Sequence, residues 1–396
     1  GHKLHLETSK KISNATHSVA VMSGSFVQRG EPALVDKWSR AKMAIEGGVD
    51  LVLELPCLYS ISSAELFASG GVKILNSLNC IDYLGFGSEI GEIKPLDDIS
   101  NLLVNETEEF KVILKDGLKK GLSYANSRSI AVSSLLSYGE YDYSGIISKS
   151  NNILGIEYIK ALRKLESKIE PVTFRRVGSD YNDLSVDVEI ASASAIRNLI
   201  FNMGHLQCKP LLPKSSYDIL DDFYSDYGVF NNLERYLDII SYLLLIHSRK
   251  DLSDYFDVED GLENRIKNLN LEDYKIQDII DEVTSKRIAS SRIRRLLVHL
   301  LLGIKKDQIL ESKNHTPGYI RVLGSNEKGF EIINRIKESS ELNIITKFSD
   351  VNSIGNKTDR MLLDKEILST NLYFYGLSGK LENRDYDYIN TPYIKK

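Results

Sequence analysis

The chain has 396 residues, of which 42% are apolar and 27% are charged, as in a soluble globular protein with room for two or three domains. It contains no apolar run of about 18 residues, so we expect no membrane-spanning helix. The net charge of −5 excludes a uniformly basic surface for nucleic acid, but a nucleic-acid binder needs only a local basic face.

Three scattered cysteines, Cys57, Cys80 and Cys208, form neither a disulfide framework nor a CxxC metal motif. No secretory or transit segment is visible at the start of the sequence. These features predict a cytoplasmic protein with no bound metal, and no stable protein partner is evident.

The first half of the chain alternates short β-rich runs with stretches of helical length. The expected strands are residues 18–24, 49–56, 81–89 and 170–178, and the expected helices are 33–48, 62–79 and 151–168. Alternating units of this size favour an α/β fold, a parallel sheet with helices on both faces. Ligands bind such sheets beyond the carboxyl ends of the strands.

After residue 205 the character of the sequence changes. Residues 213–311 are polar and helical in period, and 319–347 reads as strand, helix, strand. Gly204, Pro210 and Pro213 mark the linker. We therefore predict a first domain over 1–207 and a mainly helical region over 208–396.

Several polar motifs follow the expected strands, and each allows a structural and a functional interpretation. In "MSGSFVQRGEP", Gln28 and Arg29 either present donors to an anion or lie on an exposed loop. "GFGSE" lets a ligand approach the backbone or is simply a tight turn. One polar side chain of "SNN" (150–152) should cap the following helix, which leaves amides for a nucleotide.

Two later motifs carry arginines. Arg175 and Arg176 are adjacent at a strand end, so their side chains should point to opposite faces of the sheet. In "SASAIR", Ser192, Ser194 and Arg197 either bind phosphate at a helix N-terminus or are a cap and an exposed arginine.

The remaining candidates lie at the start of the chain and far downstream. His2 and His5 of "GHKLHL" share one helix face, either exposed to solvent or, after a preceding strand, beside a phosphate. "KRIASSRIRRLL" predicts a basic helix that packs through Ile288, Ile293 and Leu296. It is either a solvated face or a contact for an RNA backbone, through five residues: Lys286, Arg287, Arg292, Arg294 and Arg295.

Taken together and in this order, the motifs are specific. The segments "FVQRGEPA", "DKWSRAKMA", "NNILGIEY", "LGFGSE", "FRRVG", "SASAIR" and "YIRVLGSNEKG" resemble the bacterial tRNA(Met) cytidine acetate ligase family. The first domain of that family resembles the HxGH nucleotidyltransferases. The resemblance implies a Rossmann-like domain of the HUP type, followed by a mainly helical region that binds tRNA.

The resemblance also implies a reaction and its participants. Acetate would be activated by ATP, with Mg²⁺ inferred from ATP chemistry, as acetyl-adenylate. The acetyl group would then pass to the wobble cytidine of elongator tRNA(Met), giving N4-acetylcytidine. His2, Ser194 and Arg197 would be the catalytic residues that hold the phosphates. Contacts with ATP would come from a larger set: Gly1, His2, His5, Gly87, Asn151, Asn152, Arg175 and Arg176.

The sequence departs from the family pattern in two places. Family members begin with a strand and a turn carrying a first histidine, and this sequence starts at the last two residues of that turn, Gly1 and His2. As written, we expect the chain to lack full activity. Ser25 stands where the family usually has asparagine. The alternatives are a small-molecule nucleotidyltransferase of the HxGH superfamily and a non-catalytic RNA-binding protein.

Overall fold

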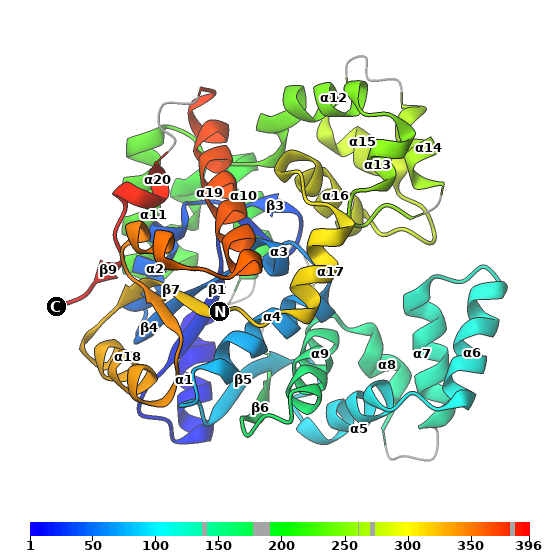
Figure 1. The fold of residues 1–396 in the computed structure, drawn as a ribbon, viewed down its shortest axis with the longest axis horizontal. Helices are drawn as coiled ribbons and strands as arrows, with labels where there is room; N and C mark the ends of the chain where they lie inside the picture. The colour runs from blue at the N-terminus through cyan, green and yellow to red at the C-terminus, as the bar shows by residue number, and fades with distance from the viewer. Residues whose placement is uncertain (137–140, 177–190, 260, 270–273, 381–384) are drawn as a thin grey trace.

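The computed structural model describes residues 1–136, 141–176, 191–259, 261–269, 274–380 and 385–396. The four expected strands are present in the first half of the chain (Figure 1). They are β1 (Val19–Ser23), β4 (Leu51–Leu55), β5 (Tyr83–Ser88) and β6 (Glu170–Arg175). The α/β class predicted from alternating periodicity is confirmed.

The strands pair in parallel, but in two separate sheets. β1 pairs with β4, with Val19 opposite Leu51, and β5 pairs with β6, with Tyr83 opposite Glu170. Among the described residues these pairs are not joined into the single sheet that the sequence favours. A two-stranded hairpin, β2 (Phe26–Val27) and β3 (Glu31–Pro32), follows β1.

The predicted strand-helix-strand unit is present as β7 (Tyr319–Ser325), α18 (Glu327–Ser339) and β8 (Asn343–Ile345). β7 pairs antiparallel with β4 and parallel with both β8 and β9 (Tyr393–Ile394), so one mixed five-stranded sheet contains strands from both ends of the chain. All residues of β4 and β7 are buried, as expected of strands covered on both faces.

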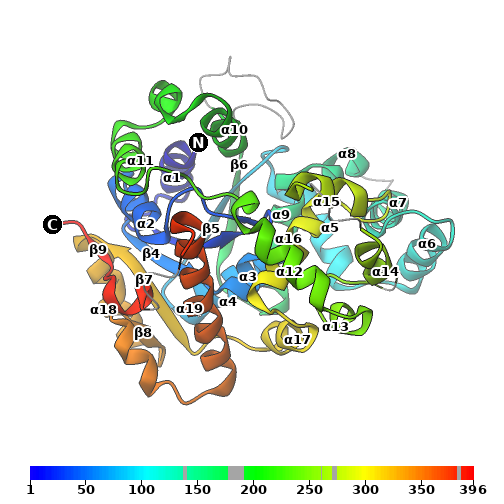
Figure 2. The same cartoon turned by 90° about the horizontal axis from the view of Figure 1, so that it is seen from above.

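Helices cover both faces of this sheet. Val52 and Leu323 pack on α2 through Ala41 and Ile45, whereas α18 covers the opposite face (Figure 2). The α2 helix starts where it does because the Asp36 carboxylate accepts hydrogen bonds from the next backbone N–H groups. The helices of the first half are α1 (His2–Ser13), α2 (Lys37–Glu46), α3 (Cys57–Ser60), α4 (Ala64–Ser77), α5 (Ile93–Val104), α6 (Glu108–Lys119), α7 (Tyr124–Leu135), α8 (Tyr143–Ser148), α9 (Ser150–Lys164) and α10 (Ala193–Met203).

The second half is mainly helical, as predicted. Its helices are α11 (Lys214–Tyr227), α12 (Leu237–Ile246), α13 (Arg249–Ser253), α14 (Leu262–Lys267), α15 (Ile276–Val283), α16 (Ser290–Leu302), α17 (Lys306–Asn314), α19 (Lys357–Ser378) and α20 (Tyr386–Ile389), with 3-10 turns η1 (His205–Leu211), η2 (Leu233–Tyr236) and η3 (Phe348–Ser353). No helix in the described part of the chain is long and apolar enough to cross a membrane.

The predicted boundary at residues 207 and 208 remains a prediction, and the hydrophobic core crosses it. One continuous cluster of buried side chains runs from Phe26 to Leu377. A smaller cluster lies where α5 to α9 pack on Phe86 of β5. The two halves of the chain therefore fold around shared apolar surface.

Candidate functional site

Helix α1 lies on the β5–β6 pair and brings both N-terminal histidines to it. The ring nitrogen Nε2 of His5 donates a hydrogen bond to the Gly85 carbonyl, with an N–O distance of 3.2 Å. The His5 ring also meets Phe174 edge-on, with ring centroids 5.1 Å apart. A Cβ atom at Gly85 would lie 2.6 Å from the Ser9 hydroxyl, so the glycine permits this close packing. His2 lies one helical turn from His5, at the start of α1.

Arg176 lies near both histidines. Its side chain crosses Gly87, where a Cβ atom would lie 2.8 Å from the Arg176 Cγ atom. The pKa values of His2 and His5 are lowered, first by desolvation and further by neighbouring positive charges that include Arg176. Two imidazoles and one guanidinium thus gather near the carboxyl end of β5. The single N–H of neutral His5 is held by the Gly85 carbonyl, so His2 and Arg176 are the members with N–H groups for phosphate oxygens.

Arg175 points the other way, as strand alternation predicts. Its Nε atom donates to the Glu89 carbonyl at 3.3 Å, and its backbone packs on Gly91. Gly91 has a φ of +74°, which favours glycine. The structure therefore brings Gly87 and Arg176 to the histidines and places Arg175 against the following loop.

The loop after β5 is fixed by α9, and Glu89 is the centre of that contact. The Glu89 carboxylate accepts hydrogen bonds from the Asn151 backbone N–H (3.1 Å), the Asn151 amide (2.7 Å) and the Asn152 backbone N–H (2.7 Å). The expectation that a side chain of residues 150–152 caps this helix is wrong, because Glu89 from another element supplies the acceptor.

Asn152 completes the contact from the opposite direction. Its Oδ1 atom accepts hydrogen bonds from the backbone N–H groups of Glu89 (2.8 Å) and Ile90 (3.1 Å), and its amide donates to the Ile146 carbonyl (3.0 Å). Only 2% of Asn152 is exposed. Its observed contacts position the loop beside Gly87, and a direct contact with ATP remains a prediction.

We expect Glu89→Ala to lower the free energy of unfolding by roughly 1–3 kcal/mol, because it leaves N–H donors at the start of α9 without their acceptor. Denaturant unfolding would measure this loss. Glu92→Ala is the matched control: Glu92 is exposed and accepts one hydrogen bond, from the Tyr141 hydroxyl, so its loss should cost less than about 1 kcal/mol. Equal losses would contradict the capping role of Glu89.

A second group of predicted residues meets at the β2–β3 hairpin. Ser192 caps α10 by accepting from the Ala195 N–H at 3.1 Å, as the structural interpretation of this motif expects. The Arg29 guanidinium donates to the Ser194 hydroxyl. Arg197 is less exposed than expected of a solvated side chain, because it pairs with the Glu31 carboxylate at 3.0 Å. The hairpin, Ser194 and Arg197 therefore form one connected unit.

The predicted basic helix is shorter than expected and largely neutralised. α16 begins at Ser290, so Lys286 and Arg287 lie in the preceding loop, and the prediction of helical spacing between Arg287 and Arg294 is wrong. Ile293 and Leu296 are buried, as predicted, whereas Ile288 lies in the preceding loop and is half-buried, so its place on the helix face was predicted wrongly. Three arginines are held by acidic partners: Arg292 pairs with Glu259 at 2.6 Å, Arg294 with Glu31 at 3.3 Å and Arg295 with Asp257 at 3.4 Å. Lys286 and Arg287 are exposed.

Comparison with known proteins identifies the family. A family profile described as HIGH Nucleotidyl Transferase matches residues 1–387. The tRNA(Met) cytidine acetate ligase of Clostridium perfringens (strain SM101) is 42% identical over 100% of this chain and 96% of its own length. A ligase of the same name from Thermoanaerobacter sp. (strain X514) is also 42% identical, over 94% of this chain and 91% of its own. The chain belongs to the tRNA(Met) cytidine acetate ligase family.

Solved structures agree with this assignment. The apo crystal structure of Thermotoga maritima TmcAL superposes with a TM-score of 0.94 at 31% identity, covering 99% of this chain and 96% of that one. A second T. maritima TmcAL structure, bound with alpha-thio ATP, has a TM-score of 0.91 at 30% identity and covers 99% and 95%. The family resemblance read from the motifs is confirmed.

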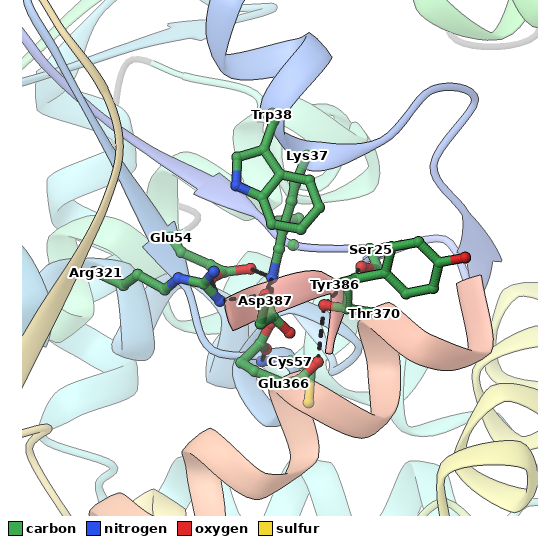
Figure 3. Close-up of polar contacts among 12 residues, drawn as sticks. Ser25, Lys37, Trp38, Glu54, Cys57, Arg321, Glu366, Thr370, Tyr386 and Asp387 are labelled. Atoms are coloured by element: carbon green, nitrogen blue, oxygen red, sulfur yellow. Dashed lines mark hydrogen bonds and ion pairs between the residues drawn. The ribbon is translucent and has the colours of Figure 1, made fainter. Parts of the chain in front are cut away.

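This member of the ligase family also contains a buried ionic cluster that the sequence did not reveal (Figure 3). Lys37, the first residue of α2, lies 2.8 Å from Glu54 of β4 and 2.7 Å from Asp387 of α20. Arg321 of β7 lies 3.0 Å from Glu54 and 2.7 Å from Asp387. A third carboxylic acid, Glu366 of α19, accepts a hydrogen bond from the Cys57 N–H. The cluster therefore connects the end of β4 and the start of α3 to helices α19 and α20.

The charges of the cluster are matched if one acid is protonated. Burial opposes ionisation of Glu54 and Asp387, yet Lys37 and Arg321 hold both pKa values below their usual range. Burial and the charge of Glu54 raise the pKa of Glu366 well above its usual value. Neutral Glu366 leaves two cations facing two carboxylates.

The Ser25 hydroxyl, at the position where we expected a departure from the family pattern, lies beside this cluster. It is buried and donates to the Thr370 hydroxyl of α19 at 3.5 Å. Ser25 therefore belongs to the packed junction with α19.

Proposed function

We propose that this protein is an ATP-dependent ligase that acetylates the wobble cytidine of elongator tRNA(Met), giving N4-acetylcytidine. The observation that carries this proposal is the 42% identity to the C. perfringens tRNA(Met) cytidine acetate ligase over 100% of the chain. The T. maritima TmcAL bound with alpha-thio ATP supports ATP as the nucleotide.

The proposed reaction has two steps. A carboxylate oxygen of acetate attacks the α-phosphorus of ATP, and pyrophosphate leaves. The N4 amine of cytidine then attacks the carbonyl carbon of acetyl-adenylate. AMP leaves, and the amine loses a proton. Acetate alone is a poor acyl donor, so the first step supplies the leaving group, and the enzyme contributes positioning and charge stabilisation on phosphate.

We assign the phosphate-binding roles to two groups of side chains. At the end of β5, His2 and Arg176 offer donors, His5 is held in place by the Gly85 carbonyl, and Gly87 makes room for the Arg176 side chain; we assign all four residues to the ATP site. Ser194 and Arg197 would hold the departing pyrophosphate. Gly1, Arg175, Asn151 and Asn152 complete the proposed ATP site, the two asparagines chiefly through the loop that they fix with Glu89.

Mg²⁺ is proposed from the chemistry of ATP. Among the described residues, no group of three His, Cys, Asp or Glu side chains is placed to hold a metal ion. We propose that Mg²⁺ reaches the site on phosphate oxygens, and we assign no step of the reaction to a protein-bound metal.

Incubation with ATP, Mg²⁺, labelled acetate and unmodified tRNA(Met), followed by digestion of the RNA to nucleosides, tests the proposal. Label on cytidine is the expected result. Formation of an adenylate product without RNA labelling would favour a small-molecule nucleotidyltransferase. Binding of RNA with neither ATP binding nor acetyl-adenylate would favour a non-catalytic RNA-binding protein. Because the proposed substrate is a tRNA, we expect the protein to act in the cytoplasm.

We propose that the basic segment before and within α16 contacts the tRNA backbone. Lys286 and Arg287 are the exposed members, whereas Arg292, Arg294 and Arg295 reach RNA only if their acidic partners release them. Arg287 also donates to the Gly121 carbonyl at 3.2 Å, which places this loop against the end of α6.

We expect Lys286→Ala with Arg287→Ala to weaken tRNA binding and to reduce the slope of log affinity against log salt by about 2, because two phosphate contacts are lost. Acetyl-adenylate formation should stay unchanged. Arg335→Ala with Lys337→Ala, on the exposed side of α18, is the matched control. If the double variant has the same salt slope as the wild type, Lys286 and Arg287 do not contact the tRNA backbone.

A further inference from the structure

The Glu31 carboxylate bridges two arginines from helices far apart in the sequence. Its Oε2 atom lies 3.0 Å from Arg197 Nε on α10, and its Oε1 atom lies 3.3 Å from Arg294 Nη1 on α16. The three side chains are 19–26% exposed, so water screens the pairs only in part. Each carboxylate oxygen therefore holds a different helix.

The hairpin that carries Glu31 is itself pressed against α16. Gly30 has a φ of +74°, and a Cβ atom there would lie 2.2 Å from the Arg295 backbone nitrogen. The Gly30 N–H closes the turn on the Val27 carbonyl at 2.9 Å. Because this contact is between backbones, Glu31 cannot move far unless α16 moves with it.

Arg197 is held by one ion pair and by two backbone carbonyls. Besides the Glu31 carboxylate, the Pro32 carbonyl accepts from Nη1 at 3.1 Å and the Asn231 carbonyl accepts from Nη2 at 3.2 Å. A guanidinium has five N–H donors, so these bonds leave donors on the two terminal nitrogens for an anion. Glu31 supplies the carboxylate of this group, and its Oε2 atom pairs with Nε of the guanidinium.

We propose that Glu31 is a positioning residue that aims Arg197 at the leaving pyrophosphate and makes this aim depend on Arg294 of α16. The inference rests on the proposed function. It also moves Arg294 from the RNA surface to the support of the adenylation step. One carboxylate between two guanidinium groups leaves a net positive charge, as a phosphate site requires.

Acetate-dependent exchange of labelled pyrophosphate into ATP tests this inference. We expect Glu31→Gln to lower kcat for exchange about 10-fold, with KM for ATP changed less than about 2-fold, because the ion pair that orients Arg197 is lost. Glu31→Asp should recover part of the rate. If the role of Glu31 is purely structural, Glu31→Gln should instead lower Tm, without a selective loss of kcat over KM. That result would contradict the inference.

The coupling to α16 is tested by a double-mutant cycle. Arg294→Gln should lower the exchange rate in the same direction as Glu31→Gln, and the double variant should be no slower than Glu31→Gln alone. An unchanged rate in Arg294→Gln, additive losses, or faster exchange in Glu31→Gln would overturn the inference. Absence of exchange in the wild-type protein would instead overturn the proposed function.

Discussion

Replacing Lys37 with methionine is expected to lower the free energy of unfolding by roughly 3–5 kcal/mol. The Lys37 side chain is fully buried and lies within 2.8 Å of Glu54 and 2.7 Å of Asp387. Its removal leaves those carboxylates inside the protein with Arg321 as their remaining cation in the cluster, and an uncompensated buried charge is among the costliest single changes. Denaturant unfolding at neutral pH measures the effect.

Glu366→Gln is the matched control for this prediction. Burial and the Glu54 charge raise the pKa of Glu366 well above its usual value, so we expect Glu366 to be the protonated acid of the cluster, which an amide replaces without changing the charge. We expect a loss below about 1.5 kcal/mol, the range of one neutral hydrogen bond. Adding Asp387→Asn to Lys37→Met should restore part of the lost stability. A Lys37→Met variant as stable as Glu366→Gln would contradict the charge balance described above.

The cluster also shows which features the sequence could not predict. Lys37 and Asp387 are separated by almost the whole chain, and no local pattern links two such residues. The same limit applies to β7: its periodicity predicts a strand correctly, but its antiparallel pairing with β4 depends on the tertiary fold. Strands and helices follow from residue spacing within a segment, whereas sheet order follows from contacts between distant segments.

In the candidate site, too, the sequence predicts features that depend on neighbouring residues and misses those that depend on distant ones. Strand alternation correctly predicts that Arg175 and Arg176 face opposite ways, because that rule is local. The sequence did not reveal Glu89 as a helix cap, because the N–H groups that donate to it belong to Asn151 and Asn152, 62 and 63 residues away. The acid directly after "GFGS" and the cap-like residues before α9 were both visible, yet nothing in the sequence joined them. The acidic partners of the α16 arginines are likewise distant in the sequence. The basic run alone therefore predicted a helix face with no acidic neighbours.

Arg176→Ala is expected to slow acetate-dependent pyrophosphate exchange about 10- to 100-fold, the range for losing a hydrogen bond to a charged group. The Arg176 side chain lies over Gly87, and its charge helps to lower the pKa values of His2 and His5, so we expect its guanidinium to face the proposed phosphates. Its removal should raise the pKa of His2 and His5 toward their usual value, since one positive neighbour is lost. Exchange rates and histidine titration by NMR measure the two effects separately.

The neighbouring arginine provides the control. Arg175→Ala removes an equal charge from the same strand end, but its side chain contacts the Glu89 carbonyl and packs on Gly91, away from the histidines. We expect a smaller loss of exchange, below about 10-fold, and little change in histidine titration. If Arg175→Ala slows exchange as much as Arg176→Ala, then net charge at the strand end, and not the direction of the side chain, determines phosphate binding. If neither variant slows exchange, the phosphates lie elsewhere and the grouping of His2, His5 and Arg176 has another purpose.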